Sequence, residues 1–164
     1  MNKKPSPREP KEHLSLSTAA DVLLSETRMV LPGIQALFGF QLVAVFNTVF
    51  HEQLSPTEQG LHLLATALVA VAIALIMTPA AYHRQTGMHD ITQRFIDIST
   101  HLMLVSVVPL ASSICLEIYL ISRIILHSVS AAVAIALGLF GLFGIMWFAF
   151  PRIDFLQRLF DSRR

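Results

Sequence analysis

One uncharged stretch limits what this chain can fold into more than any other feature. It begins directly after the charged residues Glu26 and Arg28 and continues for about twenty residues, the length a helix needs to cross the ~30 Å hydrocarbon layer of a bilayer. No water is present in that layer to bond the backbone, whereas a helix satisfies its own amide and carbonyl groups. The stretch therefore predicts a membrane-spanning helix over residues 29–50.

Three further apolar runs follow, and the composition agrees with them. Residues 61–82, 99–121 and 128–150 carry Glu117 as their only charged residue. The chain is 54% hydrophobic and 14% charged, whereas a soluble domain is about 25% charged. We therefore expect an all-α integral membrane four-helix bundle, a single domain over residues 14–164 that has the lipid bilayer as its solvent. The first run is too long for the core of a signal peptide and should remain in the mature protein.

The two ends of the chain have a different character. Residues 1–13 are rich in proline and basic side chains and lack apolar periodicity, which predicts a disordered tail. Residues 14–28 and 153–160 each have an apolar side, which is typical of amphipathic helices that lie on a membrane surface. We therefore expect interfacial helices at both ends of the bundle.

The basic residues predict an orientation. In the four-span arrangement every lysine and arginine except Arg123 falls on one side of the membrane. Because cytoplasmic loops are enriched in lysine and arginine, both termini should be cytoplasmic.

Several classes of function find no support in the sequence. The formal net charge is only +1, which gives no basic surface for nucleic acid. The single cysteine, Cys115, excludes an internal disulfide and a paired-cysteine metal site. No nucleotide-binding loop, zinc-binding helix or serine nucleophile motif is present. We therefore expect a protein that is not an enzyme, with no catalytic residue, no metal ligand and no cofactor.

Two short motifs resemble a known family. They carry Glu26, Arg28, Pro32, Gly33 and Gln35 at the first span, and Pro79, His83 and Arg84 at the end of the second. The chain resembles, over roughly residues 20–150, a bacterial family of four-helix membrane proteins catalogued as a domain of unknown function, number six-three-two-eight. The resemblance implies a bacterial inner (cytoplasmic) membrane location. Some members carry an automatically assigned sodium:proton antiporter label. The ionisable residues of this chain have to be compared with what such an activity requires.

Glu117 is the acid within the predicted spans. It lies about seven residues, or ~10 Å, from the middle of its helix, so it can still reach water at the outer face. One hypothesis is that it binds an ion, as intramembrane carboxylates do in transporters. The alternative, which we favour, is a carboxylate that reaches the interface or pairs locally near Arg123.

Amides and histidines offer weaker candidates. Gln35, Gln41 and Asn47 point ~120° apart on a helix, so they cannot line one pore, and each is expected to bond a neighbouring helix. Gln35 is the strongest exception because it belongs to the family pattern. His62 and His83 lie about 31 Å apart along one helix, which favours interfacial positions over a haem site.

Two patterns predict contacts inside the bundle. Small residues recur at steps of three and four on two helices, and they favour close packing within the molecule over a homodimer face. These residues are Ala67, Ala70 and Ala74 on the second helix, and Ala131, Ala134, Gly138 and Gly141 on the fourth. At the cytoplasmic end, Glu26 is expected to face Arg84 and to form an ion pair with it.

The function remains open between two classes. The first, which the sequence favours, is a non-enzymatic membrane component, either a homo-oligomer or a partner of another membrane protein. The second is a small ion or solute transporter. Transport would be favoured by two or more polar groups meeting inside the bilayer, and helical periodicity alone does not bring them together.

Overall fold

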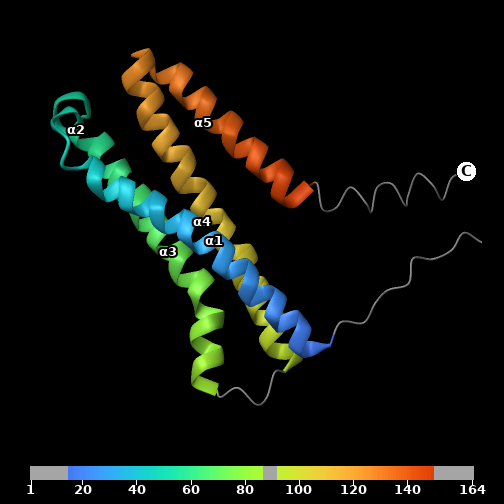
Figure 1. Cartoon of the computed structure of the whole chain (residues 1–164). Helices are drawn as coiled ribbons and strands as arrows, with labels where there is room; N and C mark the ends of the chain where they lie inside the picture. Colours follow the sequence, from blue (N-terminus) through green and yellow to red (C-terminus); the bar gives the residue numbers. More distant parts are fainter. Residues whose placement is uncertain (1–14, 87–91, 150–164) are drawn as a thin grey trace, which may run out of the picture.

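The computed structural model of the chain describes residues 15–86 and 92–149, and the secondary structure in those ranges is helical (Figure 1). The elements are α1 (Leu16–Ala44), α2 (Thr48–Gln53), α3 (Pro56–Thr86), α4 (Gln93–Leu126), α5 (Val129–Gly144) and a π-helical turn, η1 (Ile145–Ala149). The tail predicted over residues 1–13 and the interfacial helix predicted over 153–160 lie outside the described residues.

Side-chain caps fix where these helices begin. The Thr92 hydroxyl accepts the amide of Phe95 at the start of α4, and Ser128 begins α5 in the same way. Helix α3 begins with a capping box, in which the Ser55 amide donates to the Glu58 carboxylate at 2.9 Å and the Glu58 amide donates to the Ser55 hydroxyl at 3.4 Å. Each cap satisfies amides that a helix leaves unpaired in its first turn.

Helix α1 differs from its prediction at both ends. It is one helix of 29 residues that continues through Pro32, so the segment expected on the membrane surface is part of it. It ends at Ala44, six residues short of the predicted end of the span, because the Asn47 side chain accepts the amide of Val49 and begins α2. An asparagine side chain that accepts from a nearby backbone amide favours the start of a new helix over continuation of the preceding helix.

Three helices are long and apolar enough to cross a membrane, which suggests a membrane protein. They are Pro56–Tyr82 within α3, Gln93–Leu126, and Val129–Ala149, which joins α5 to η1. The first half of α1 carries Asp21, Glu26 and Arg28, and α1 is not among the three.

The core is built from three stripes at coiled-coil spacing. On α3 the buried residues recur at steps of three and four, those of α1 recur every seven residues, and one set of the buried residues of α4 also recurs every seven. They are His62, Ala65, Val69, Ala72, Ile76 and Pro79 on α3, Ala20, Thr27, Ile34 and Gln41 on α1, and Ser99, Ser106, Ser113 and Leu120 on α4. The small side chains among them let the helix backbones approach closely. Helix α1 lies across α3 and α4, whereas α5 packs on α4 (Figure 1).

The small residues predicted to pack lie elsewhere. Ala67, Ala70 and Ala74 of α3 are exposed, and the buried alanines are Ala65 and Ala72. On α5, a Cβ added to Gly138 or Gly141 would meet no atom within 4 Å, and the buried residue is Ala132. The prediction that these small residues form the packed seam is therefore wrong, because α3 and α5 turn other faces toward their neighbours.

The alanines of α3 allow a matched test of this seam. We expect Ala72→Leu to lower the free energy of unfolding in detergent by about 1–3 kcal/mol, because Ala72 is fully buried and an added side chain overpacks its contact. The control is Ala70→Leu, at an exposed position one half-turn away. Equal melting temperatures for the two variants would contradict this assignment of the packed face.

Candidate functional site

Four polar residues from three helices meet near the end of the bundle where α2 lies. Gln41 comes from α1, His62 from α3, and Ser113 and Glu117 from α4. Gln41 and His62 are each 4% exposed and Ser113 is 0% exposed. The Glu117 side chain keeps 17% of its surface. All four lie on the stripes that form the core or next to them, so packing of the helices brings them together.

His62 is held through both ring nitrogens. Its Nε2 lies 3.0 Å from the backbone oxygen of Gln41, and its Nδ1 lies 2.9 Å from Oε1 of Glu117. A carbonyl oxygen can only accept, so the hydrogen bond to Gln41 requires a proton on Nε2. Nδ1 and the Glu117 carboxyl then share one further proton. The contact is either an imidazolium beside a carboxylate or a neutral imidazole that accepts from a carboxylic acid.

The Gln41 side chain connects α1 to the same carboxyl group. Its Nε2 donates to the Ser113 hydroxyl and to Oε1 of Glu117, both at 3.1 Å. Its Oε1 is buried and has no hydrogen-bond partner among the described residues. A buried carbonyl without a partner costs about 1–3 kcal/mol, so this oxygen is an acceptor position for a donor or a cation.

A cavity of about 220 Å³ reaches His62 and Glu117 from the α2 end. Asn47, Phe50 and Leu54 are among the residues that line it, and the Phe50 ring meets the His62 ring edge to face with centroids 4.9 Å apart. Toward the other end of the bundle, the neighbouring core is apolar and contains Ile34, Val69 and Ile76. The site is therefore approached from one end in this structure.

The site lies between the middle and one end of the candidate span Pro56–Tyr82. Val69 is the middle residue of Pro56–Tyr82, and His62 precedes it by seven residues. At 1.5 Å per residue, His62 is ~10 Å from the middle of the span, within the ~15 Å half-thickness of the hydrocarbon layer. Ionisable groups at such depth are costly, and where they occur they commonly serve ion or substrate pathways.

A second ion pair lies closer to the end of the bundle. Nε of Arg123 is 3.6 Å from Oε1 of Glu58, which also accepts the Ser55 hydroxyl through Oε2 at 2.7 Å. The prediction that Glu117 pairs near Arg123 is therefore wrong. Arg123 pairs with Glu58, and Glu117 pairs with His62.

Of the three amides of the first predicted span, Gln41 alone bonds the Glu117 carboxyl, while Asn47 lines the cavity that leads to it. Gln35 is exposed, and Asn47 caps α2, so Gln41 alone among the three amides of the first span is a buried bridge between helices. His62 is buried between the helices, which its sequence position near a helix end did not indicate. The missed signal is spacing: Gln41 lies seven residues from Ile34, on the stripe that also holds Ala20 and Thr27.

The charged motif residues lie at the opposite end. Glu26, Arg28 and Arg84 are all exposed. Within residues 15–86 and 92–149, the ion pairs are His62–Glu117 and Glu58–Arg123, so the predicted Glu26–Arg84 pair is wrong. The side chain of His83 lies outside the description. The described residues contain no group of three or more histidine, cysteine, aspartate or glutamate side chains arranged to hold a metal ion.

The described helices and the site together indicate a helical membrane protein with a partly buried acid beside a buried imidazole. The family of unknown function DUF6328 matches residues 15–151, so the chain belongs to that family. No curated protein and no solved structure matches the chain.

The His62–Glu117 contact should appear as a large coupling energy. We expect His62→Leu and Glu117→Leu each to destabilise the protein in detergent, because each leaves its polar partner buried without a counterpart. The double variant should be more stable than the sum of the single effects predicts, by roughly 0.5–3 kcal/mol.

The matched control is the corresponding cycle at Glu58 and Arg123. That pair is longer and Arg123 is more exposed, so its coupling should be below about 1 kcal/mol. Additive effects at His62 and Glu117 would show that their contact is not formed in the folded protein.

Proposed function

We propose that this protein is a small ion-coupled transporter, and that it binds a proton or a monovalent cation at the acid–imidazole site formed by His62 and Glu117. The observation that carries the proposal is the meeting of these two ionisable groups with the Gln41 amide inside the span. Ion-coupled transport requires ionisable groups that converge within the bilayer, whereas packing needs only a hydrogen bond between uncharged side chains.

The chemistry follows from the shared proton. When a proton leaves the pair, the site keeps a carboxylate beside a neutral imidazole, and its net charge becomes negative. That charge attracts either another proton or a monovalent cation, for which the Glu117 carboxylate and the unpartnered Gln41 oxygen are suitable oxygen ligands. Competition between a proton and a cation for one carboxylate is the simplest basis for exchange.

Transport also requires access from both sides in turn. The cavity beside Phe50 serves the α2 end, and the apolar residues around Val69 separate the site from the opposite end. A second conformation has to open that path. The seam between α1 and the α3–α4 pair is the natural place for this motion, because Gln41 is the side chain of α1 that bonds the Glu117 carboxyl.

A membrane component without transport activity is the second candidate. The helix formed by α5 and η1 favours this second candidate. Only 6% of its most apolar 18-residue stretch is buried, compared with 28% for the corresponding stretches of α3 and α4. A second copy or another membrane protein would cover such a helix. Neither candidate function involves enzymatic chemistry.

The proposed setting is the bacterial inner membrane, with four crossings and both termini in the cytoplasm. The fourth crossing would use α1, whose uncharged part over residues 29–44 extends ~24 Å. Arg28, Arg84 and Arg94 lie at one end of the described helices and Arg123 lies at the other. By the positive-inside rule the three-arginine end is cytoplasmic, so the α2 end faces the periplasm.

Flux through the site can be measured in proteoliposomes that contain a pH-sensitive dye. Wild-type protein should change the internal pH when a sodium or potassium gradient is imposed, and Glu117→Gln should abolish the change because it cannot release a proton. His62→Gln should slow it.

The control is Glu52→Gln, which removes an exposed acid from α2 and should leave the flux intact. If the wild-type protein moves no proton under any of these gradients, or if Glu117→Gln matches it, the transport proposal fails and the component role is preferred.

Orientation can be tested with two matched single-cysteine variants in a Cys115→Ala background. Gln53→Cys lies at the end of α2 and Gln93→Cys at the start of α4, and both positions are exposed. In intact cells a membrane-impermeant maleimide should label the first, and the second should be labelled only after permeabilisation. Labelling of both from the same side would refute the proposed orientation.

A further inference from the structure

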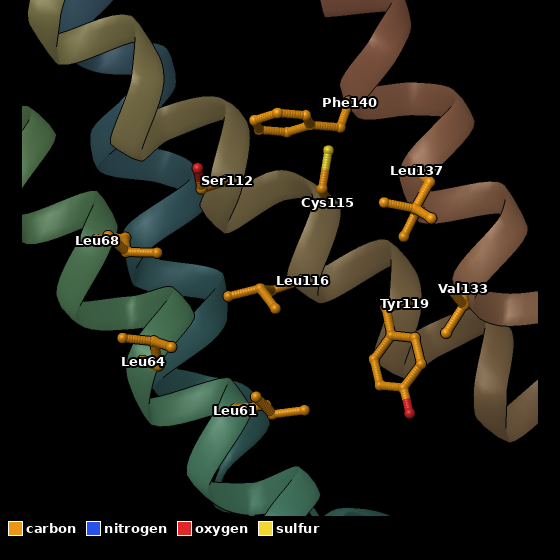
Figure 2. Close-up of a pocket in the computed structure, with 11 residues that line it drawn as sticks. Leu61, Leu64, Leu68, Ser112, Cys115, Leu116, Tyr119, Val133, Leu137 and Phe140 are labelled. Atoms are coloured by element: carbon orange, nitrogen blue, oxygen red, sulfur yellow. The ribbon is translucent and has the colours of Figure 1, made fainter. Parts of the chain in front are cut away.

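A wide apolar groove runs between α3 and α5, with α4 as its floor. Its volume is about 580 Å³. Figure 2 shows Leu116 and Tyr119 projecting from α4 between the leucines of α3 and the side chains of α5. The Ser112 hydroxyl, also on the groove wall, donates to the Val108 carbonyl at 2.9 Å and so is already satisfied. The groove is therefore suited to an apolar occupant.

The groove has the depth of a single leaflet. On α3 it is lined from Leu61 to Leu68, and Leu68 adjoins Val69, the middle residue of the span. Seven residues correspond to ~10 Å along a helix, which is most of the ~15 Å half-thickness of the hydrocarbon layer. The linings on α4 and α5 each extend over the same distance, from Ser112 to Tyr119 and from Val133 to Phe140. The groove thus begins near the membrane surface at the α2 end and stops near the middle.

The length of the groove favours an acyl chain over a transmembrane helix as its occupant. A transmembrane helix crosses the full ~30 Å of the hydrocarbon layer, whereas the lined groove extends over ~10 Å of it. An extended hydrocarbon chain is much thinner than a helix and ends near the middle of the bilayer, as the groove does.

A positive charge lies beyond the surface end of the groove. Tyr119 lines the groove, and Arg123 follows it by four residues, on the same face of α4 and ~6 Å closer to the membrane surface. Arg123 contacts Glu58 through Nε, and its side chain is 34% exposed. A guanidinium has five N–H donors, so its two terminal nitrogens have further donors for an anion.

We propose that the groove binds one acyl chain of a phospholipid from the leaflet at the α2 end, and that Arg123 binds the phosphate of the same lipid. The apolar lining, the one-leaflet depth and the charge at the surface end match the two parts of that ligand. The acyl chain would contact both α3 and α5. It would thereby link α5, which packs mainly on α4, to α3 as well. This proposal does not depend on ion transport.

Native mass spectrometry of the purified protein titrated with phosphatidylglycerol tests the assignment. The first lipid should bind wild-type protein with the highest affinity, and Leu64→Trp, which fills the groove from α3, should weaken that first event. Leu137→Trp should act in the same way from α5. Arg123→Gln should weaken it about fivefold, the effect of one basic residue near an anionic lipid surface.

The matched control is Leu63→Trp. Leu63 neighbours Leu64, is 70% exposed and does not line the groove, so this variant should bind the first lipid as wild type does. Leu64 and Leu137 are themselves 49% and 66% exposed, so tryptophan at either position should leave the fold intact, and melting temperatures verify this.

Three results would overturn the proposal. The first is unchanged lipid affinity in both groove variants, and the second is an equal loss of lipid affinity in Leu63→Trp. The third is a wild-type dimer that Leu64→Trp converts to a monomer without altering lipid affinity, which would assign the groove to a second copy of the chain.

Discussion

The contact between His62 and Glu117 is the interaction on which the arrangement of the helices most depends. It joins α3 to α4 inside the span, and the backbone oxygen of Gln41 on the other ring nitrogen extends it to α1. Gln41 and His62 are almost completely buried there, so each helix has to present its polar group in a fixed rotation. Three otherwise apolar helices thereby acquire one alignment.

The apolar seams make this alignment possible. Alanines on α3 and serines on α4 form stripes at coiled-coil spacing, and their small side chains let the backbones approach closely. In the α4 stripe the Ser106 hydroxyl donates to the Met103 carbonyl of its own helix at 2.6 Å, and the Ser113 hydroxyl accepts from the Gln41 amide of α1. They therefore add no unsatisfied group to the interface. The stripe of α3 starts at His62, so the same packing that forms the core also buries the imidazole.

Much of the fold could be read from the sequence, and the site only in part. Three predicted spans agree with α3, α4 and the helix formed by α5 and η1. Glu117 was recognised because one acid in a long apolar run stands out. The predicted bond from Gln41 to a neighbouring helix is confirmed, but its partners and the part of His62 cannot be read from the sequence, since an amide and a histidine near a helix end are common. Asn47 misled the prediction of the first span, because an internal asparagine can be either a residue within a helix or the cap of the next one.

The sequence by itself determined that this chain forms long apolar helices, where charge separates them, and which acid lies between their ends. These properties follow from local composition, because burial in lipid and backbone hydrogen bonding act on each segment alone. The tertiary structure decided that Glu117 meets His62 and Gln41, that Arg123 meets Glu58, and that Gly138 and Gly141 face open space. The reason is rotational: a helix sequence gives the spacing of its side chains, but only packing against neighbours sets which face turns inward.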